Sequence, residues 1–433
     1  LGVDALRAAW QAGRIAASAD TEAVLATALG ARARPVRLPD DARPALADGG
    51  WAIVPAHELT PAWSVIAVAG AHPLAGADTP LVVPLCGGAA GGGNIDPGTL
   101  STVVLSGTTA MTGQLAEHID VHGVAATIAE LQPFFASADL VHVSNEVAFV
   151  RTCQPWAGQQ KLVFCARDRY LELLAALHVR LVELTGNHLL DYGAPALART
   201  LDLYAQRGWI WFGGGRTQID ATAPRLVADH GNRLAFVGCN AVNWWIGAIS
   251  PGLGVAHCDW PRMIWQIQEL RRAGYLPIAT VQHRELRTHT PPPDLVHDLR
   301  QLAEAGAIAV IGSQAHVAHP WDVHAGAYVH YGPGNLLFAQ RRPIQRDATV
   351  DKLYVHAGRL LTVERLFTRA DHGRPRRLTD RERAALLGAL RDAEAAVAPP
   401  APWAAPTIPP PSRARPDALV VRGRSQPLDV VVP

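Results

Sequence analysis

The residues best suited to chemistry follow the apolar run 181–184, which is typical of a buried strand. Asn187, His188 and Asp191 lie within five residues of one another, and an amide oxygen, an imidazole and a carboxylate suit a divalent cation. Gly186, just before them, permits a sharp turn that a side chain would block. Open α/β sheets place their ligands at the carboxyl ends of strands, where these side chains fall. The pattern also fits a plain strand-to-helix turn with Asn and Asp as turn and cap residues.

Three further strand ends carry polar side chains that could meet this stretch. Asn145 and Glu146 follow the apolar run 140–143, His283 and Glu285 follow 277–282, and His316 follows 307–311. Strands alternate with helical segments throughout this part of the chain, which is typical of a layered α/β domain with its site along one rim of a sheet. We therefore expect Asn145, Asn187, His188 and His316 to line a common cavity.

Length and composition set the outer limits. The chain has 433 residues and a formal net charge of +1, so there is a substantial core and no electrostatic case for nucleic acid. No run of eighteen apolar residues is present, so membrane association is expected only through an anchor upstream of Leu1, where the sequence starts without Met.

Four segments differ in composition. Residues 1–85 predict a small N-terminal α/β domain without clustered chemistry, and 86–100 a Gly-rich linker. Residues 101–397 predict the main α/β domain, followed by a Pro-rich spacer and C-terminal tail at 398–433. A weaker hypothesis gives residues 1–85 a regulatory ligand, although no site there supports it.

The five cysteines form no C-x-x-C pair, which argues against a structural zinc site. Cys153 with Cys165, and Cys239 with Cys258, each bracket a short loop. Two local disulfides would imply an oxidising compartment, and five buried thiols are the alternative.

Seven segments between residues 101 and 340 carry a likeness to a known family. They are 105–113, Ser144-Asn145-Glu146, Gly186-Asn187-His188 with Asp191-Tyr192-Gly193, 213–216, 282–285, 312–316 and 331–338. In this order they resemble the CapA family, which is linked to capsule and poly-γ-glutamate synthesis. The resemblance implies a layered sandwich related to the calcineurin-like metallophosphoesterases, with the N-terminal α/β domain outside it.

The departures from the family pattern concern the metal site. Thr108 stands where the first motif would supply an Asp, and Gln314 stands where the last motif would supply a second His. In the segment 282–285, the side chain directed toward the metal site could be that of Gln282 or that of His283. Since a two-metal hydrolase needs several ligands for its ions, one ion (Mn, Zn, Mg or Fe) is expected rather than two. The predicted metal ligands are Asn145, Asn187, His188, His283 and His316.

The resemblance leaves two functions open. One is an extracytoplasmic, metal-dependent hydrolase or transferase for an anionic cell-surface polymer or its precursor. Its predicted catalytic residues are His188 as general acid, Asp191 as its orienting partner, and Glu146 or Glu285 as base. The other is a non-catalytic protein that binds polymer or scaffolds its synthesis on the same fold, with a degenerate metal centre.

Overall fold

The structure is a computed structural model that describes residues 2–17, 19–31, 33, 51–69, 72–74, 95–154, 162–242, 247, 252–395 and 397. The chain divides into two compact units. The smaller unit comprises Leu1–Leu100 with Tyr354–Glu364, and the larger comprises Ser101–Leu353 with Arg365–Pro433. Residues 86–94 of the predicted linker and the predicted tail at 398–433 lie outside the described residues.

The smaller unit contains a two-stranded parallel sheet, β1 (Ile15–Ala17) beside β2 (Trp51–Ile53). Helix α1 (Val3–Gln11) precedes β1, and α2 (Ala19–Leu29) lies between β1 and β2 in sequence. Trp10 is fully buried in the apolar core of this unit. The Trp10 indole N–H donates to the Gly30 carbonyl at 2.9 Å, which ties α1 to the end of α2.

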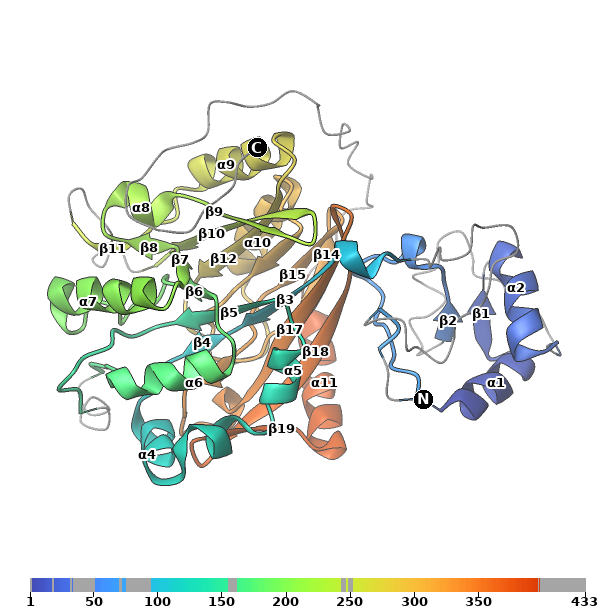
Figure 1. Ribbon diagram of the computed structural model, residues 1–433, viewed down its shortest axis with the longest axis horizontal. Helices are drawn as coiled ribbons and strands as arrows, with labels where there is room; N and C mark the ends of the chain where they lie inside the picture. The colour runs from blue at the N-terminus through green and yellow to red at the C-terminus, as the bar shows by residue number, and fades with distance from the viewer. Residues whose placement is uncertain are drawn as a thin grey trace. The chain divides into compact units, whose positions relative to one another are not determined.

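Two sheets with parallel centres build the larger unit (Figure 1). The first contains β16, β4, β5, β3, β17, β18 and β19 in that order, and β6 and β7 extend it from β5. Its central strands are β3 (Leu100–Ser106), β4 (Thr108–Thr109), β5 (Leu140–Asn145), β6 (Leu181–Glu183) and β7 (Ile210–Phe212). The remaining strands are β16 (Asn335–Leu337), β17 (Asp347–His356), β18 (Arg359–Asp371) and β19 (Arg374–Arg377).

The second sheet has the order β14-β15-β13-β12-β10-β9. Strands β10 (Asn232–Asn240), β12 (Leu276–Gln282), β13 (Ala309–Ile311) and β15 (Ala327–His330) run parallel. The edge strands β9 (Arg225–Asp229) and β14 (Trp321–His324) are antiparallel to their neighbours. A two-stranded sheet pairs β8 (Gly214–Gly215) with β11 (Gly254–Val255).

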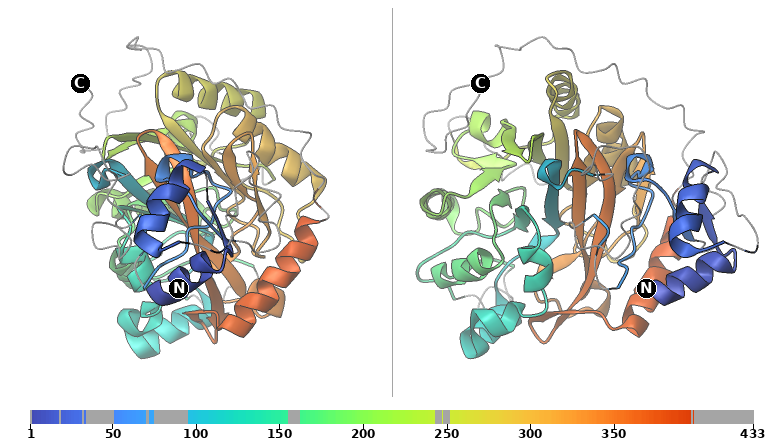
Figure 2. Two further views of the ribbon diagram at one scale, coloured as in Figure 1. Left: turned by 90° about the vertical axis from the view of Figure 1, so that its right-hand side faces the viewer. Right: turned by 45° about the vertical axis from the view of Figure 1, so that its right-hand side comes forward.

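Each sheet packs its apolar side chains against its own helices (Figures 1 and 2). The first sheet packs against α4 (Gly113–Ile128), α5 (Gln132–Ala136), α6 (Leu171–Ala176) and α7 (Gly193–Gln206). The second packs against α9 (Trp260–Arg272) and α10 (Pro293–Glu304). Short α8 (Gln218–Thr222) follows β8.

The two sheets meet through a mixed apolar and polar interface. The Phe212 and Phe236 rings lie 5.7 Å apart between β7 and β10. The Asn232 amide donates to the Ser101 hydroxyl at 3.0 Å, and the Asn240 amide donates to the Thr185 carbonyl at 2.9 Å. The predicted α/β layered fold class is therefore confirmed.

The helical segment between residues 113 and 136 is interrupted. Helix α4 begins at Gly113 and ends at Ile128. Gly123 has φ 79° and ψ 171°, which breaks the helix, and α5 starts separately at Gln132. Among the described residues, no helix has both the length and the apolarity needed to cross a bilayer.

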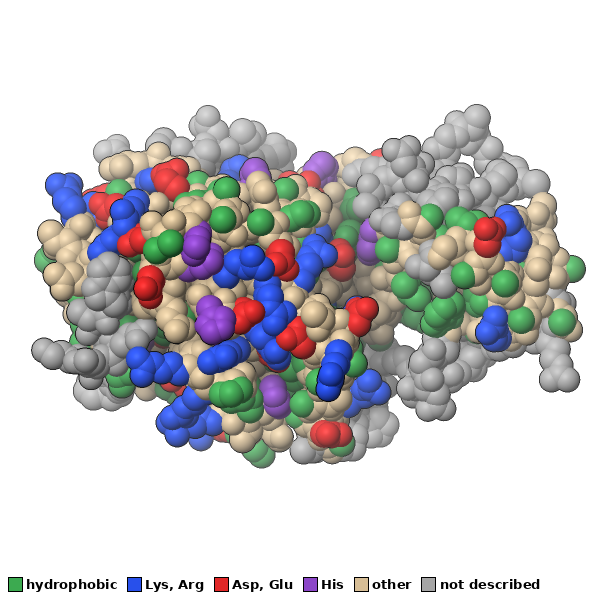
Figure 3. Space-filling view, turned by 90° about the horizontal axis from the view of Figure 1, so that it is seen from below, with side chains coloured by type: hydrophobic (Ala, Val, Ile, Leu, Met, Phe, Trp, Pro, Cys, Tyr) green, Lys and Arg blue, Asp and Glu red, His purple; other side chains and the backbone are tan. Residues whose placement is uncertain are grey.

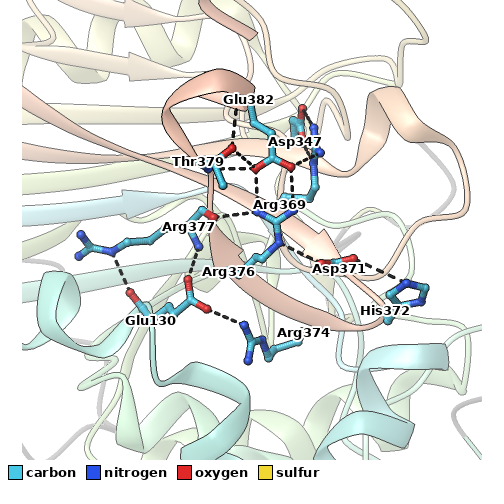
Figure 4. A network of polar contacts seen from close by, with 10 residues as sticks. All are labelled: Glu130, Asp347, Arg369, Asp371, His372, Arg374, Arg376, Arg377, Thr379 and Glu382. Atoms are coloured by element: carbon cyan, nitrogen blue, oxygen red, sulfur yellow. Dashed lines mark hydrogen bonds and ion pairs between the residues drawn. The ribbon is translucent and has the colours of Figure 1, made fainter. Parts of the chain in front are cut away.

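An ion-pair network ties the last helix, α11 (Asp380–Glu394), to β18 and β19 (Figure 4). Glu382 accepts hydrogen bonds from Arg369 at 2.5 Å and Arg376 at 2.8 Å, and it forms a capping box with Thr379. Basic and acidic side chains also lie interspersed on the face shown in Figure 3, as expected where charges pair locally. The network fixes the C-terminal end of the described fold on the first sheet.

Candidate functional site

The site lies where strands from both sheets end. Glu146 follows β5, and Asn187 and His188 follow β6, so these come from the first sheet. Glu285 follows β12 and His316 follows β13, so these come from the second. The parallel centres of both sheets direct these loops to a shared rim.

Gly186 lets two of the loops approach closely. A Cβ atom at residue 186 would lie 2.5 Å from the Glu146 Cα, which no side chain could tolerate. A parallel bridge between Val147 and His188 joins the same two loops. The glycine is therefore required for this contact, which holds His188 beside Glu146, and no left-handed backbone conformation at Gly186 is involved.

Glu146 is the centre of the group. Its side chain is fully buried, and neither carboxylate oxygen receives a hydrogen bond within the described structure. Its Oε1 lies 3.8 Å from His188 Nε2 and 3.6 Å from His316 Nε2. A buried carboxylate without donors is costly unless a cation or a proton compensates it.

Glu285 completes the group from the solvent side. Its side chain is 47% exposed, and its Oε1 lies 3.5 Å from His316 Nε2 and 3.5 Å from Asn187 Nδ2. One ligand atom each from Glu146, Glu285 and His316 lies within 4.8 Å of the others. Glu146 and Glu285, predicted as catalytic bases, thus occupy positions suited to metal ligands.

The charges of these carboxylates change the protonation of the histidines. Burial alone lowers the pKa of His316, but Glu146 and Glu285 outweigh it and hold that pKa well above its ordinary value. Burial also lowers the pKa of His188, and the Asp191 hydrogen bond together with Glu146 and Glu285 raises it overall. The hydrogen bond from His316 lowers the pKa of Glu285. Without an ion, the site therefore favours imidazolium beside carboxylate.

His188 is held by a second carboxylate and an aromatic side chain. Its Nδ1 lies 2.7 Å from Asp191 Oδ2, and the Phe164 backbone N–H donates to the same oxygen at 2.7 Å. The Phe164 ring packs edge-on against the imidazole at 4.6 Å. Phe164 precedes Cys165, which forms a disulfide with Cys153. Asp191 therefore contacts the face of the site through His188, and its orienting role stays a prediction.

Both predicted disulfides are confirmed. Cys153 pairs with Cys165, and Cys239 pairs with Cys258, with Cα–Cα distances of 5.9 and 5.0 Å. The bonded cysteines are 12 and 19 residues apart in sequence, so both bonds are local.

Two predicted metal ligands hydrogen-bond to groups outside the cluster. The Asn145 Nδ2 donates to the Val147 carbonyl at 2.6 Å and the Tyr204 hydroxyl at 2.8 Å, and its Oδ1 is buried without a hydrogen-bond partner in the described structure. His283 Nε2 lies 3.1 Å from Asp298 Oδ2 on α10. Gln282, the alternative to His283, accepts a hydrogen bond from the Asn240 amide at 3.1 Å.

At the two positions where this chain departs from the family pattern, Thr108 and Gln314 form hydrogen bonds within the protein. The Thr108 hydroxyl donates to the Ser313 carbonyl at 3.4 Å, and Gln314 donates to the Ser144 hydroxyl at 2.7 Å. Beside them, the hydroxyls of Ser313 and Thr185 donate to fully buried Glu183. Neither Thr108 nor Gln314 offers a carboxylate or an imidazole, so neither replaces the Asp or the second His of the family pattern.

The donor set around Glu146 does fit one divalent ion. Two carboxylates and an imidazole are common ligands for Mn²⁺, Zn²⁺ or Fe²⁺. The amide oxygen of the neighbouring Asn187 is also buried and without a hydrogen-bond partner within the described structure. The buried oxygens of Glu146 and Asn187 thus lack hydrogen-bond partners. Oxygen ligands of a cation have this property when the cation is not bound.

Sequence reasoning missed several residues that support the site. Phe338 packs edge-on against His316 at 5.5 Å and against Phe164 at 5.8 Å, so one aromatic pair backs both histidines. Asn335 bonds directly to His316. The segment 331–338 carried the only sequence signal for Phe338 and Asn335, and nothing in the sequence marked Phe164.

Comparison with known proteins decides the family. Residues 102–340 match the family model described as "Bacterial capsule synthesis protein PGA_cap". The chain belongs to this family. The matched span contains every residue of the site, and the resemblance to the CapA family is confirmed.

Two curated relatives carry the CapA name. The chain is 24% identical over 247 residues to "PGA biosynthesis protein CapA" of Bacillus subtilis (strain 168), covering 55% of this chain and 64% of the relative. It is 20% identical over 259 residues to "Capsule biosynthesis protein CapA" of Bacillus anthracis, covering 58% and 62%. The matches thus span less than two thirds of each relative's length.

Solved structures offer weaker likenesses. The NAD nucleotidase of Haemophilus influenzae is 9% identical with a TM-score of 0.39, covering 68% of this chain and 56% of its own. A 5′-nucleotidase precursor from Thermus thermophilus is 17% identical with a TM-score of 0.37, covering 68% and 59%. Likenesses this weak carry no information about substrate.

Proposed function

We propose that the chain is an extracytoplasmic, metal-dependent hydrolase or transferase that acts on an anionic cell-surface polymer, or its precursor, in capsule or poly-γ-glutamate synthesis. The observation that carries the proposal is the gathering of Glu146, Glu285 and His316 within 4.8 Å. The fully buried Glu146 carboxylate, which has no hydrogen-bond donor in the described structure, supports a cation at this point. The names of the two relatives support the polymer class.

Two disulfides support the compartment. Disulfides form and persist in oxidising environments and are rare in the cytosol of mesophiles. Cys153–Cys165 and Cys239–Cys258 both belong to the unit that carries the site. In the cytosol these two disulfides would be exposed to reduction, so their presence supports an extracytoplasmic location.

One divalent ion would be held by Glu146, Glu285 and His316, with the amide oxygen of Asn187 as a further ligand. When bound, such an ion supplies Lewis acidity and lowers the pKa of water near it. His188 is the proton donor, because its Nε2 faces the group while its Nδ1 is held by Asp191 at 2.7 Å. Asp191 keeps the imidazole in this orientation and stabilises its protonated form.

The test measures metal content and turnover together. Protein stripped with chelator and reloaded with Mn²⁺ is assayed on poly-γ-glutamate for chain shortening and on a phosphate monoester. We expect about one ion per chain, and turnover that the His188→Ala variant loses by roughly 100-fold or more. The matched control is His324→Ala, since His324 on β14 pairs with Glu304 and touches no site residue among those described.

A second candidate function is a non-catalytic polymer-binding or scaffolding protein on the same fold. The observation that favours it is the commitment of Thr108 and Gln314 to hydrogen bonds within the protein. Below roughly 0.2 ion per chain, with no turnover but retained polymer binding, this candidate replaces the first.

A further inference from the structure

Asn335 makes three hydrogen bonds around His316. It begins β16, which lies parallel to β4 with Asn335 opposite Thr108, and its side chain is buried. Its Nδ2 lies 3.0 Å from the His316 carbonyl and 2.9 Å from the Gln345 carbonyl. Its Oδ1 lies 2.8 Å from His316 Nδ1. One amide thus contacts both the backbone and the ring of the same residue.

The two carbonyls fix which way the amide points. Carbonyl oxygens only accept hydrogen bonds, so the Asn335 atom facing both of them must be the NH₂ group. The Asn335 atom that faces the His316 ring is then the amide oxygen, which can only accept a hydrogen bond. His316 Nδ1 must therefore carry a hydrogen, in the neutral imidazole as well as in the imidazolium.

We propose that Asn335 is a positioning residue that fixes His316 as the Nδ1–H tautomer, so that Nε2 is the atom presented to Glu146 and Glu285. Nε2 lies 3.6 Å from Glu146 Oε1 and 3.5 Å from Glu285 Oε1, on the opposite edge of the ring from Asn335. The neutral ring then directs its lone pair at the point where the two carboxylates converge. The importance of this lone pair for an ion rests on the proposed function, but the tautomer does not.

The backbone of His316 gives Asn335 a second task. His316 has φ 59°, a left-handed conformation that residues with a side chain rarely adopt. Such conformations persist where surrounding contacts determine them, and they cluster at functional sites. The Asn335 amide holds the carbonyl of this residue while its oxygen holds the ring, so backbone and imidazole are fixed by one group.

Histidine NMR on the full chain tests the tautomer. Protein with ¹⁵N-labelled histidine and no metal is measured by long-range ¹H–¹⁵N correlation at a pH high enough that His316 is neutral, because the imidazolium carries a hydrogen on both nitrogens. His316 is identified by its absence in His316→Gln. We expect a protonated Nδ1 in the native chain and in Asn335→Asp, which keeps an acceptor, and loss of this preference in Asn335→Leu. A native His316 with bare Nδ1 and protonated Nε2 overturns the proposal, whether or not any variant folds.

Metal affinity separates this proposal from the proposed function. Mn²⁺ titration should show a roughly 10–100-fold weaker affinity in Asn335→Leu and a change of only a few-fold in Asn335→Asp. Asn232→Leu is the matched control, because Asn232 is equally buried and bonds to Ser101 at a distance from the site. Native protein with the expected tautomer but no Mn²⁺ binding refutes the metal-dependent function and leaves the positioning assignment supported. Equal Mn²⁺ affinity in the native chain and Asn335→Leu overturns the positioning role.

Discussion

Removing the Cys153–Cys165 disulfide should loosen the segments that hold His188, whereas removing Cys239–Cys258 should leave those segments unchanged. The perturbations are the double variants Cys153→Ser with Cys165→Ser, and Cys239→Ser with Cys258→Ser. The two bonds span sequence separations of 12 and 19 residues. Loop-closure entropy then predicts a loss of about 3 kcal/mol in the free energy of unfolding for each. Global stability alone therefore cannot distinguish the two bonds.

The difference lies in what each bond adjoins. Cys165 follows Phe164, whose N–H donates to Asp191 Oδ2 at 2.7 Å and whose ring packs on His188. Cys239 instead contacts Met263 of α9, with its sulfur 3.4 Å from the methionine sulfur, in the apolar core of the second sheet. Loss of the first bond frees the chain segment that holds His188. Loss of the second loosens a core that does not contain His188 or Asp191.

Hydrogen–deuterium exchange with mass spectrometry measures this difference, and urea unfolding measures the loss of stability. We expect faster exchange in peptides covering 162–170 and 187–193 in the first double variant only. Each variant is compared at a urea concentration well below its own unfolding midpoint, so that local opening dominates exchange. Unchanged exchange at 187–193 in the first variant, at a stability loss of about 3 kcal/mol, would refute the coupling of this disulfide to His188.

Three further predictions follow from the same contacts. Glu146→Gln should weaken Mn²⁺ binding by more than roughly 100-fold, since it removes the buried charge at the centre of the group, and a calorimetric affinity within about threefold of native contradicts this. His316 has a raised pKa in the folded chain, so its protonated form stabilises metal-free protein fully below the unfolded pKa of about 6.5, and this contribution is lost as pH rises through the folded pKa. The stability difference between native and His316→Gln should therefore shrink with rising pH in urea unfolding, and a constant difference would count against it. Glu382→Ala should lower the free energy of unfolding by about 1–3 kcal/mol, because it removes a helix cap and two arginine contacts; Asp392→Ala on the same helix should change it by less than about 0.5 kcal/mol.

The strands were predictable where they are apolar runs. Runs such as 140–143 and 277–282 are buried on both faces, so their composition identified them without any knowledge of their neighbours. The long strands β17 and β18 were missed because polar residues interrupt them. Asp351 in β17 is fully buried, with its carboxylate 2.5 Å from His330 Nδ1, and such a partner is visible only in three dimensions.

The same limit applies to the site. Sequence placed Glu146, His188 and His316 at the ends of separate strands, and the structure brings both imidazoles beside one Glu146 oxygen. Sequence could not decide between adjacent residues, because neighbours near a strand end point to opposite faces. Thus the Asn145 amide nitrogen bonds to Tyr204 while Glu146 lies beside the histidines. His283 and Glu285 lie beyond the end of β12, where strand alternation no longer applies, and there His283 contacts Asp298 while Glu285 joins the group.

The division of the site between the two sheets has a mechanical consequence. Glu146 follows a strand of the first sheet, whereas Glu285 and His316 follow strands of the second. Any cation bound among these residues would therefore crosslink the two sheets. Sliding of one sheet along the other would separate these ligands, so the protein with a bound cation would resist such shear more strongly than the protein without it. Substitutions distant from the site that shift one sheet relative to the other could therefore change the affinity for the cation without altering any of its ligands.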